Sequence, residues 1–242
     1  MPDEGRGQPS ASYRSPDGRN VLAMRLSELA RELQADDPEQ TLHDIVVAAV
    51  ETVPGAVHAG ISEVESRREV HTAAATDDLV RGVDQAQYDT AEGPCLTALF
   101  DQRTIRVADT EAESRWPTFI GKAADLGVRS MLSFQLYVAR DNLGALNLYA
   151  WEPHAFSDES EDVGLLFAAH AAVAMADARK VQQLSLAVSA RDLIGQAKGI
   201  LMERHKVTGD QAFALLVRAS QHTNVKLVEI ARELTETGEL AR

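Results

Sequence analysis

The sequence of 242 residues predicts an α+β protein. We expect an antiparallel sheet flanked by helices, followed by a long linking helix and a C-terminal bundle of three helices. Three observations support this fold class. Apolar residues alternate on both sides of the turn Arg140-Asp141-Asn142, residues 158–205 keep a helical pattern without proline, and two short segments with helix-capping residues follow.

Residues 1–20 are polar and rich in Gly, Pro and Ser. They lack the apolar core of a signal peptide, so we expect a disordered tail. Asp37-Pro38 is a typical helix start, and Thr76 is a typical N-cap. The predicted elements are helices over 21–34 and 38–53, strands over 56–64 and 68–76, a helix capped by Thr76 and ending near Gln87, a short helix from Pro94, a strand over 103–109, a helix from Pro117 and a β-hairpin over 130–150.

Residues 158–205 would form a single helix about 70 Å long at 1.5 Å per residue. Within it, Val181, Leu184 and Val188 are three and four residues apart, as in the seam of a coiled coil. This seam covers barely one heptad. Two interpretations stay open: a contact between two copies of the chain, or a domain-packing helix that continues as a linker.

Two shorter helices follow the long one. Thr208 and Gln211 form a capping-box pattern, which starts a helix ending near Gln221. We expect Asn224 to cap a third helix that ends near Thr237-Gly238. The apolar residues of the bundle predict one small core: Ile194, Ala197, Ile200, Leu201, Ala212, Phe213, Leu215, Leu216, Ala219, Leu227, Ile230 and Ala231.

Two glycines interrupt the helical stretch LIGQAKGILMERHKV at residues 193–207. Gly195 and Gly199 each cost about 1 kcal/mol relative to alanine inside a helix. We interpret them as sites of close helix crossing, which small residues permit. Close approach of a nucleic-acid backbone is the second interpretation.

The composition excludes several classes of protein. Cys95 is the only cysteine, which excludes an internal disulfide and a multi-cysteine metal site. The histidines show no metal-ligand spacing, so we predict no metal site and no identified cofactor. No window of 18 apolar residues could span a membrane, and we expect a cytoplasmic protein. Cys95 fits a buried small side chain better than a nucleophile, so we expect no enzyme, with catalysis by Cys95 as the rival hypothesis.

Charge is unevenly distributed along this acidic chain, whose formal net charge is -13. Residues 1–190 carry 16 basic and 30 acidic side chains, whereas residues 191–232 carry seven basic and four acidic ones. Because only the C-terminal segment is basic, it is the segment expected to meet a polyanion.

At the C-terminus, "IGQAKGILMER", "AFALLVRASQHTN" and "KLVEIA" resemble the ANTAR domain over roughly residues 187–235. Upstream, "QYDTAEGPCL", "RWPTF", "GVRSMLS" and "GALNLYA" resemble the GAF half of actinobacterial GAF-ANTAR regulators over roughly residues 21–180. The expected organisation is a tail over 1–20, a GAF sensor domain over 21–180 and an ANTAR domain over 181–242.

The resemblance implies a transcription antitermination regulator in which the ANTAR bundle binds paired stem-loops in nascent transcripts and a GAF domain controls it. We expect a homodimer with RNA and an unidentified small-molecule signal as partners. Cations attract RNA phosphates, and amides and hydroxyls contact exposed base edges. The candidate RNA-binding residues are Arg191, Gln196, Lys198, Arg204, Arg218, Ser220, Gln221, Asn224 and Lys226.

The ligand of the expected sensor domain is not identified by the sequence. Weak candidates for a pocket are His71, Tyr88, Trp116 and Phe119, although each also fits a core position. A domain retained only for dimerisation and helix transmission is the alternative. Two further alternatives for the whole chain are a DNA-binding regulator, because three short helices also describe a helix-turn-helix, and a ligand-binding dimerisation protein without direct RNA contact.

Overall fold

The computed structural model of the protein describes residues 37–64, 69–101, 103–139 and 141–240. The tail expected over 1–20 and the helix expected over 21–34 lie outside these residues. Contacts divide the chain into two compact units, with the division between Ala178 and Arg179.

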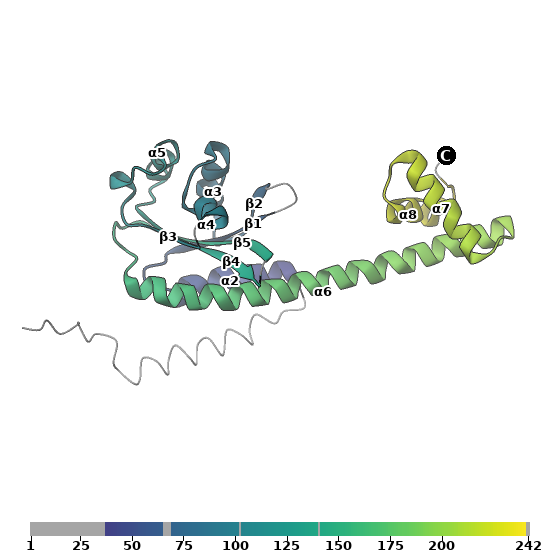
Figure 1. Ribbon diagram of the computed structural model, residues 1–242, viewed down its shortest axis with the longest axis horizontal. Helices are drawn as coiled ribbons and strands as arrows, with labels where there is room; N and C mark the ends of the chain where they lie inside the picture. The colour runs from purple at the N-terminus through teal and green to yellow at the C-terminus, as the bar shows by residue number, and fades with distance from the viewer. Residues whose placement is uncertain (1–36, 65–68, 102, 140, 241–242) are drawn as a thin grey trace, which may run out of the picture. The chain divides into compact units, whose positions relative to one another are not determined.

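A five-stranded antiparallel sheet forms the centre of the first unit (Figure 1). Its order is β2-β1-β5-β4-β3, and the strands are β1 (His58–Val64), β2 (Val70–Ala75), β3 (Thr104–Val107), β4 (Ser130–Val138) and β5 (Asp141–Ala150). β4 and β5 form the predicted hairpin, in which Ser130 pairs with Ala150 and Val138 with Asp141. From Leu143 onward every residue of β5 is buried, so this central strand needs cover on both faces of the sheet.

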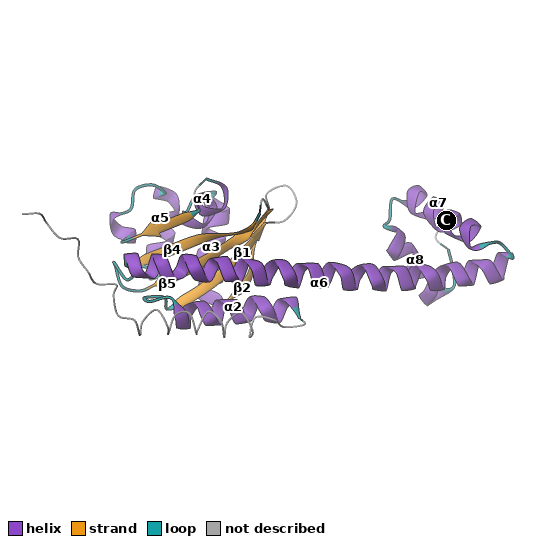
Figure 2. Cartoon of the chain, turned by 60° about the horizontal axis from the view of Figure 1, so that its bottom comes forward, coloured by secondary structure: helices purple, strands orange, loops and turns teal. Residues whose placement is uncertain are grey.

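One face of the sheet is covered by α2 (Pro38–Thr52) and by the first part of α6 (Asp158–His205), which run side by side (Figure 2). Asp37 caps α2 by accepting the N–H of Glu39, as its position before Pro38 predicts. The resulting core contains Ile45 from α2, Phe134 from the sheet and Phe167 from α6.

The opposite face is covered by α3 (Asp78–Thr90), α4 (Pro94–Phe100) and α5 (Pro117–Asp125), with a short 3-10 helix at Thr110–Ala112. The predicted cap of α3 is wrong by one residue. Asp77 is the N-cap and accepts the N–H groups of Leu79 and Val80. The Thr76 hydroxyl accepts the N–H of Ala59 instead, because Thr76 still lies beside β1.

The helix α6 is continuous from Asp158 to His205, as predicted. After it come α7 (Gly209–Thr223) and α8 (Leu227–Thr237). Both hydrogen bonds of the predicted capping box are present: Thr208 Oγ1 accepts from Gln211 N at 3.4 Å, and Gln211 Oε1 accepts from Thr208 N at 2.9 Å.

The predicted cap of α8 is wrong. Asn224 is the C-cap of α7, in the left-handed conformation with φ of 55°, and Lys226 occupies the N-cap position of α8 without a side-chain hydrogen bond. Asparagine is favoured both at N-caps and in left-handed positions, so its identity alone does not distinguish the two roles.

The core of the second unit contains the predicted apolar residues, with one exception. Its buried members are Ala197, Leu201, Ala212, Leu216, Ala219, Ile230, Ala231 and Leu234. Phe213 was expected there, but its side chain is 41% exposed. Ala212, Leu216 and Ala219 define the buried face of α7, and Phe213 lies about 100° around the helix from Ala212.

Candidate functional site

A buried cluster of polar side chains lies between the sheet and α3. At its centre is Asp84 of α3, which is fully buried. Its carboxylate accepts hydrogen bonds from the Tyr149 hydroxyl, from Thr72 Oγ1 at 2.9 Å and from Asn147 Nδ2 at 3.3 Å. The donors come from β5 and β2, so the carboxylate ties α3 to two strands of the sheet.

Burial raises the pKa of Asp84 from 3.8 to about 6, because the charged form loses its hydration. The hydrogen bonds from Tyr149, Thr72 and Asn147 oppose this rise, as does the charge of Arg81. Asp84 was not among the candidate residues predicted from the sequence. The sequence pattern could have indicated that Asp84 is buried. Asp84 is spaced three or four residues from Val80 and Gln87 and follows Val83, so it falls on the buried face of the helix.

Asn147 and Tyr88 extend the cluster. Asn147 Nδ2 donates to Ser62 Oγ at 3.0 Å, whereas its buried Oδ1 atom has no hydrogen-bond partner among the described residues. The Tyr88 hydroxyl lies 2.7 Å from Ser62 Oγ and 3.1 Å from Thr72 Oγ1. Burial raises the pKa of Tyr88 well above its usual value, with the Asp84 charge adding to the rise, so Tyr88 stays a neutral donor.

Cys95 is part of the same cluster and is buried. Its Sγ donates to Ser62 Oγ at 3.3 Å, and its backbone N–H donates to Gln87 Oε1 at 2.9 Å. Burial raises the pKa of the Cys95 thiol from 9.0 to about 12, and the nearby Asp84 charge adds to the rise. The thiolate that a nucleophile requires is therefore a minor species at neutral pH.

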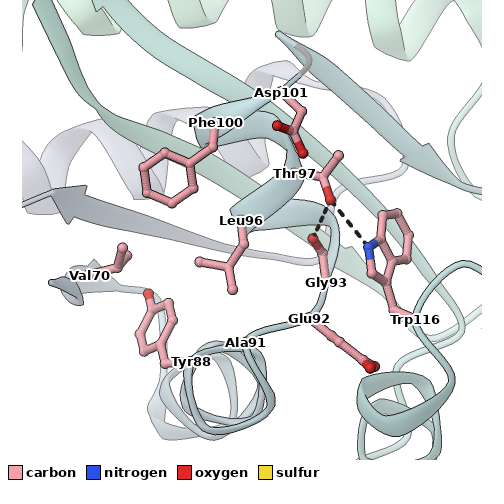
Figure 3. Close-up of a pocket in the computed structure, with 10 residues that line it drawn as sticks. All are labelled: Val70, Tyr88, Ala91, Glu92, Gly93, Leu96, Thr97, Phe100, Asp101 and Trp116. Carbon is pink, nitrogen blue, oxygen red and sulfur yellow. Dashed lines mark hydrogen bonds between the residues drawn. The ribbon is translucent and has the colours of Figure 1, made fainter. Parts of the chain in front are cut away.

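A pocket of about 420 Å³ lies around α4 and shares Tyr88 with this cluster. Its lining residues are Val70, Tyr88, Ala91, Glu92, Gly93, Leu96, Thr97, Phe100, Asp101 and Trp116. Figure 3 shows Tyr88, Leu96 and Phe100 on one side of α4 and Trp116 on the other, where its indole N–H donates to Thr97 Oγ1 at 3.2 Å.

The four candidate pocket residues separate into two pairs. Tyr88 and Trp116 line the pocket. Phe119 does not, because it is fully buried in the core between α3, α5 and the sheet. His71 lies on β2, with its Nε2 atom 3.8 Å from Glu63 Oε2, and it does not line the pocket either.

In the second unit, three of the nine candidate RNA-binding residues make a side-chain hydrogen bond or form a helix cap within the unit. The Arg204 guanidinium donates to the carbonyl of Gly238 at the end of α8. Ser220 Oγ donates to the carbonyl of Val225 at 2.6 Å, and Asn224 forms the C-cap of α7. These contacts connect the ends of the helices, so they give each residue a structural role.

The side chains of the other six candidates make no hydrogen bond or ion pair with the described residues. Lys198 is half-buried, and five are exposed: Arg191, Gln196, Arg218, Gln221 and Lys226. By contrast, Lys206 and Arg232, which were not candidates, pair with Glu203 at 2.5 Å and with Glu229 at 3.4 Å. The second unit thus presents cations whose charge is not neutralised by its own acids.

Phe213 is a surface residue that the sequence analysis placed in the core. Its ring lies 5.9 Å from Lys198 Nζ, close enough for a cation–π interaction. An exposed aromatic ring beside a cation can stack on a base while the cation attracts a phosphate. The helical spacing of Ala212, Leu216 and Ala219 could have shown from the sequence that Phe213 lies off the buried face of α7.

Gly195 and Gly199 of α6 lie on an exposed face. A Cβ atom at Gly195 or Gly199 would meet no atom within 4 Å, so close helix crossing within the chain is the wrong explanation for them. Gly195 shares one helical face with other exposed residues, which we call the α6 stripe: Val181, Leu184, Val188, Gly195 and Met202. Leu184 is the most exposed of them at 67%.

The described residues offer neither a membrane span nor a metal site. None of their helices is long and apolar enough to cross a membrane. Within the same part of the chain, no three His, Cys, Asp or Glu side chains gather in a way that could hold a metal ion.

Two family models match the chain. The GAF domain model matches residues 35–176, and the ANTAR domain model matches residues 182–234. No curated protein compared with the chain matched it. Since the GAF match covers more than half of the sequence, the chain belongs to the GAF domain family.

Solved structures support the same fold. The phytochrome photosensory core module of Stigmatella aurantiaca is 11% identical with a TM-score of 0.59, over 86% of this chain and 46% of that one. The GAF domain of a phosphoenolpyruvate-protein phosphotransferase from Coxiella burnetii is 22% identical with a TM-score of 0.51, over 66% and 95%. A free methionine-R-sulfoxide reductase from Neisseria meningitidis is 15% identical with a TM-score of 0.52, over 71% and 98%. The chain therefore spans less than half of the phytochrome module.

Together, the two matches identify a protein that combines a GAF domain with an ANTAR domain. GAF domains are sensor domains, and ANTAR domains are known in RNA-binding antitermination regulators. This architecture belongs to signal transduction and to the regulation of transcription termination.

Proposed function

We propose that this protein is an RNA-binding antitermination regulator, in which the ANTAR unit binds paired stem-loops of nascent transcripts under the control of the GAF unit. The observation that carries the proposal is the set of exposed cations and amides in the second unit, together with the exposed ring of Phe213, which lies 5.9 Å from the half-buried Lys198 Nζ. RNA loops present phosphates together with unstacked bases, and this group offers a contact for each.

DNA binding by α8 is the less favourable alternative. A recognition helix that enters the major groove needs cations free to meet phosphates and bases. On α8, Arg232 pairs with Glu229, and Glu233 and Glu236 are exposed acids on the same helix. These acids would repel the DNA backbone.

We further propose that the protein is a homodimer that pairs through the α6 stripe. Every residue from Val181 to Ser189 is exposed, and an isolated helix with exposed apolar side chains gains no stability from packing. A second copy of α6 would bury Val181, Leu184 and Val188. Gly195 would let the two helices approach closely, since the distance between helix axes depends on the side chains at the contact.

The signal that controls the ANTAR unit is proposed to be a small molecule bound by the GAF unit. The pocket around α4 supports this role because about 420 Å³ is within the range of small-molecule sites. α6 is the covalent route between the two units, since it begins on the sheet of the first and supplies Ala197 and Leu201 to the core of the second.

A gel-shift series tests RNA binding, with tandem RNA hairpins and duplex DNA of matched length at two salt concentrations. Lys198→Ala and Arg218→Ala should each weaken hairpin binding and reduce its salt dependence, because each removes a phosphate contact. Phe213→Ala should weaken it about tenfold through lost stacking. Lys122→Ala, an exposed cation of the first unit, is the control and should bind as the parent does.

Two results would contradict the proposal. Equal affinity for hairpins and duplex DNA would leave only nonspecific attraction between charges. If Lys122→Ala lost as much RNA binding as Lys198→Ala, RNA binding could no longer be assigned to the second unit.

A further inference from the structure

The pocket around α4 combines apolar walls with acidic groups. The rings of Tyr88, Phe100 and Trp116 and the side chains of Val70 and Leu96 supply its apolar surface (Figure 3). Among the described residues, the charged ones that line it are Glu92 and Asp101, and none of the described lining residues is Lys, Arg or His. The described lining is thus apolar and carries acidic side chains.

The Glu92 carboxylate is fixed in the pocket wall. Its Oε2 atom accepts the N–H groups of Thr118 at 2.9 Å and Phe119 at 3.2 Å, and its Oε1 atom accepts the Thr118 hydroxyl at 3.1 Å. Glu92 therefore holds the first turn of α5, and these hydrogen bonds fix the position of its carboxylate. Asp101, at the end of α4, is exposed: its backbone N–H donates to the carbonyl of Thr97, and its carboxylate makes no hydrogen bond to the other described residues.

Arg115 is a cation close to this pocket, and its charge is already paired. The guanidinium stacks on the Trp116 ring at 4.3 Å, donates to Oε1 and Oε2 of Glu113 and donates to the carbonyl of Arg106 at 2.9 Å. Arg115 lies outside the lining of the pocket, and Glu113 compensates its charge.

We propose that this pocket binds a small organic cation, namely a protonated amine carried on an aromatic or branched aliphatic body. This inference rests on the proposed sensor role of the GAF unit and names the ligand class of its site. Aromatic faces attract cations, carboxylates attract ammonium groups, and the apolar walls bury the body of the ligand. A ligand that packs against the Tyr88 ring would also touch the Asp84 cluster indirectly, because the Tyr88 hydroxyl hydrogen-bonds with Ser62 and Thr72 of that cluster.

Three probes with the same ring and different charges test the ligand class on the full chain: 2-phenylethylamine, 2-phenylethanol and phenylacetate. Isothermal titration calorimetry at pH 7 should give an affinity for the amine at least tenfold above that for the alcohol, with the carboxylate weakest. Equal affinities, preference for the carboxylate, or binding of none of the three would overturn the proposal.

Variants locate the site. Phe100→Ala and Asp101→Asn change exposed residues and should each weaken amine binding at least fivefold. Asp101→Asn should in addition leave thermal unfolding in the absence of probe unchanged. Asp125→Asn, an exposed acid of α5 outside the pocket, is the matched control and should bind as the parent does. If Asp125→Asn reduced binding as much as Asp101→Asn, the pocket assignment would fail.

These measurements use no RNA, and the gel-shift series uses no amine. Failure of amine binding therefore leaves the RNA result intact, and failure of RNA binding leaves the ligand result intact.

Discussion

At the scale of single residues, Asp84 shows how a charged group can hold a helix on a sheet at a cost in stability. Its carboxylate is fully buried and is compensated by hydrogen bonds from Tyr149, Thr72 and Asn147. These bonds do not offset the loss of hydration completely, since the pKa still rises to about 6. The ionised side chain is therefore stabilised less in the folded protein than in water.

The stability of the first unit should depend on the protonation of Asp84. Its pKa is higher in the folded state, so protonation of Asp84 stabilises the folded state relative to the unfolded one. This contribution to the unfolding free energy is fully present below pH 3.8 and is lost as the pH rises to about 6. The shift corresponds to about 3 kcal/mol. In Asp84→Asn this contribution should be absent, so the difference in unfolding free energy between parent and variant should change by up to that amount between pH 4 and pH 7.

Urea unfolding at the two pH values measures this difference. The change should favour the variant at pH 7 relative to pH 4. An identical pH dependence in parent and variant would show that Asp84 ionises in the folded protein as it does in water.

At the scale of elements, α6 has a buried part at each end and an exposed part between them. Near its start, Phe167 and Met175 are buried against the sheet of the first unit, and near its end, Ala197 and Leu201 are buried in the second. Between these parts the helix has only exposed positions from Val181 to Ser189. The α6 stripe lies partly in this stretch.

Leu184→Glu should convert the proposed dimer to monomers, because it places a charge where two stripes would meet. Sedimentation velocity at several protein concentrations measures the change. Gln182→Glu adds the same charge on nearly the opposite side of α6, about 160° from Leu184, and should leave the dimer unchanged. A parent protein that is monomeric at all concentrations would refute pairing through the stripe.

At the scale of the whole molecule, α6 is also the proposed route of the signal. Inserting a flexible Gly-Ser break near Ser185 should uncouple the two units, because a broken helix cannot transmit a change in position or in pairing. Antitermination by this variant in a reporter transcript should no longer respond to the signal. RNA binding measured separately should persist, which distinguishes lost coupling from an unfolded ANTAR unit.

A signal response unchanged by the insertion would contradict transmission through α6. The matched control is a Gly-Ser insertion of the same length after Glu239, beyond α8, which lengthens the chain without interrupting α6.

Much of the fold could be predicted because its signals are local. The alternation over β4 and β5, the helical pattern of α6 and the capping box of Thr208 and Gln211 each depend on neighbours within a few residues. Asn224 shows the limit of such signals: both helix ends favour asparagine, and the position of the preceding helix decided which end it occupies.

The sequence by itself determined the element order, the basic C-terminal segment and the resemblance to two domain families. Only the tertiary structure decided which side chains meet. It brought Asp84, Tyr149 and Thr72 together from α3, β5 and β2, left Phe213 on the surface, and tied Arg204 to the end of α8. The physical reason is that a helix pattern depends on nearby residues, whereas burial and charge compensation depend on residues far apart in the chain.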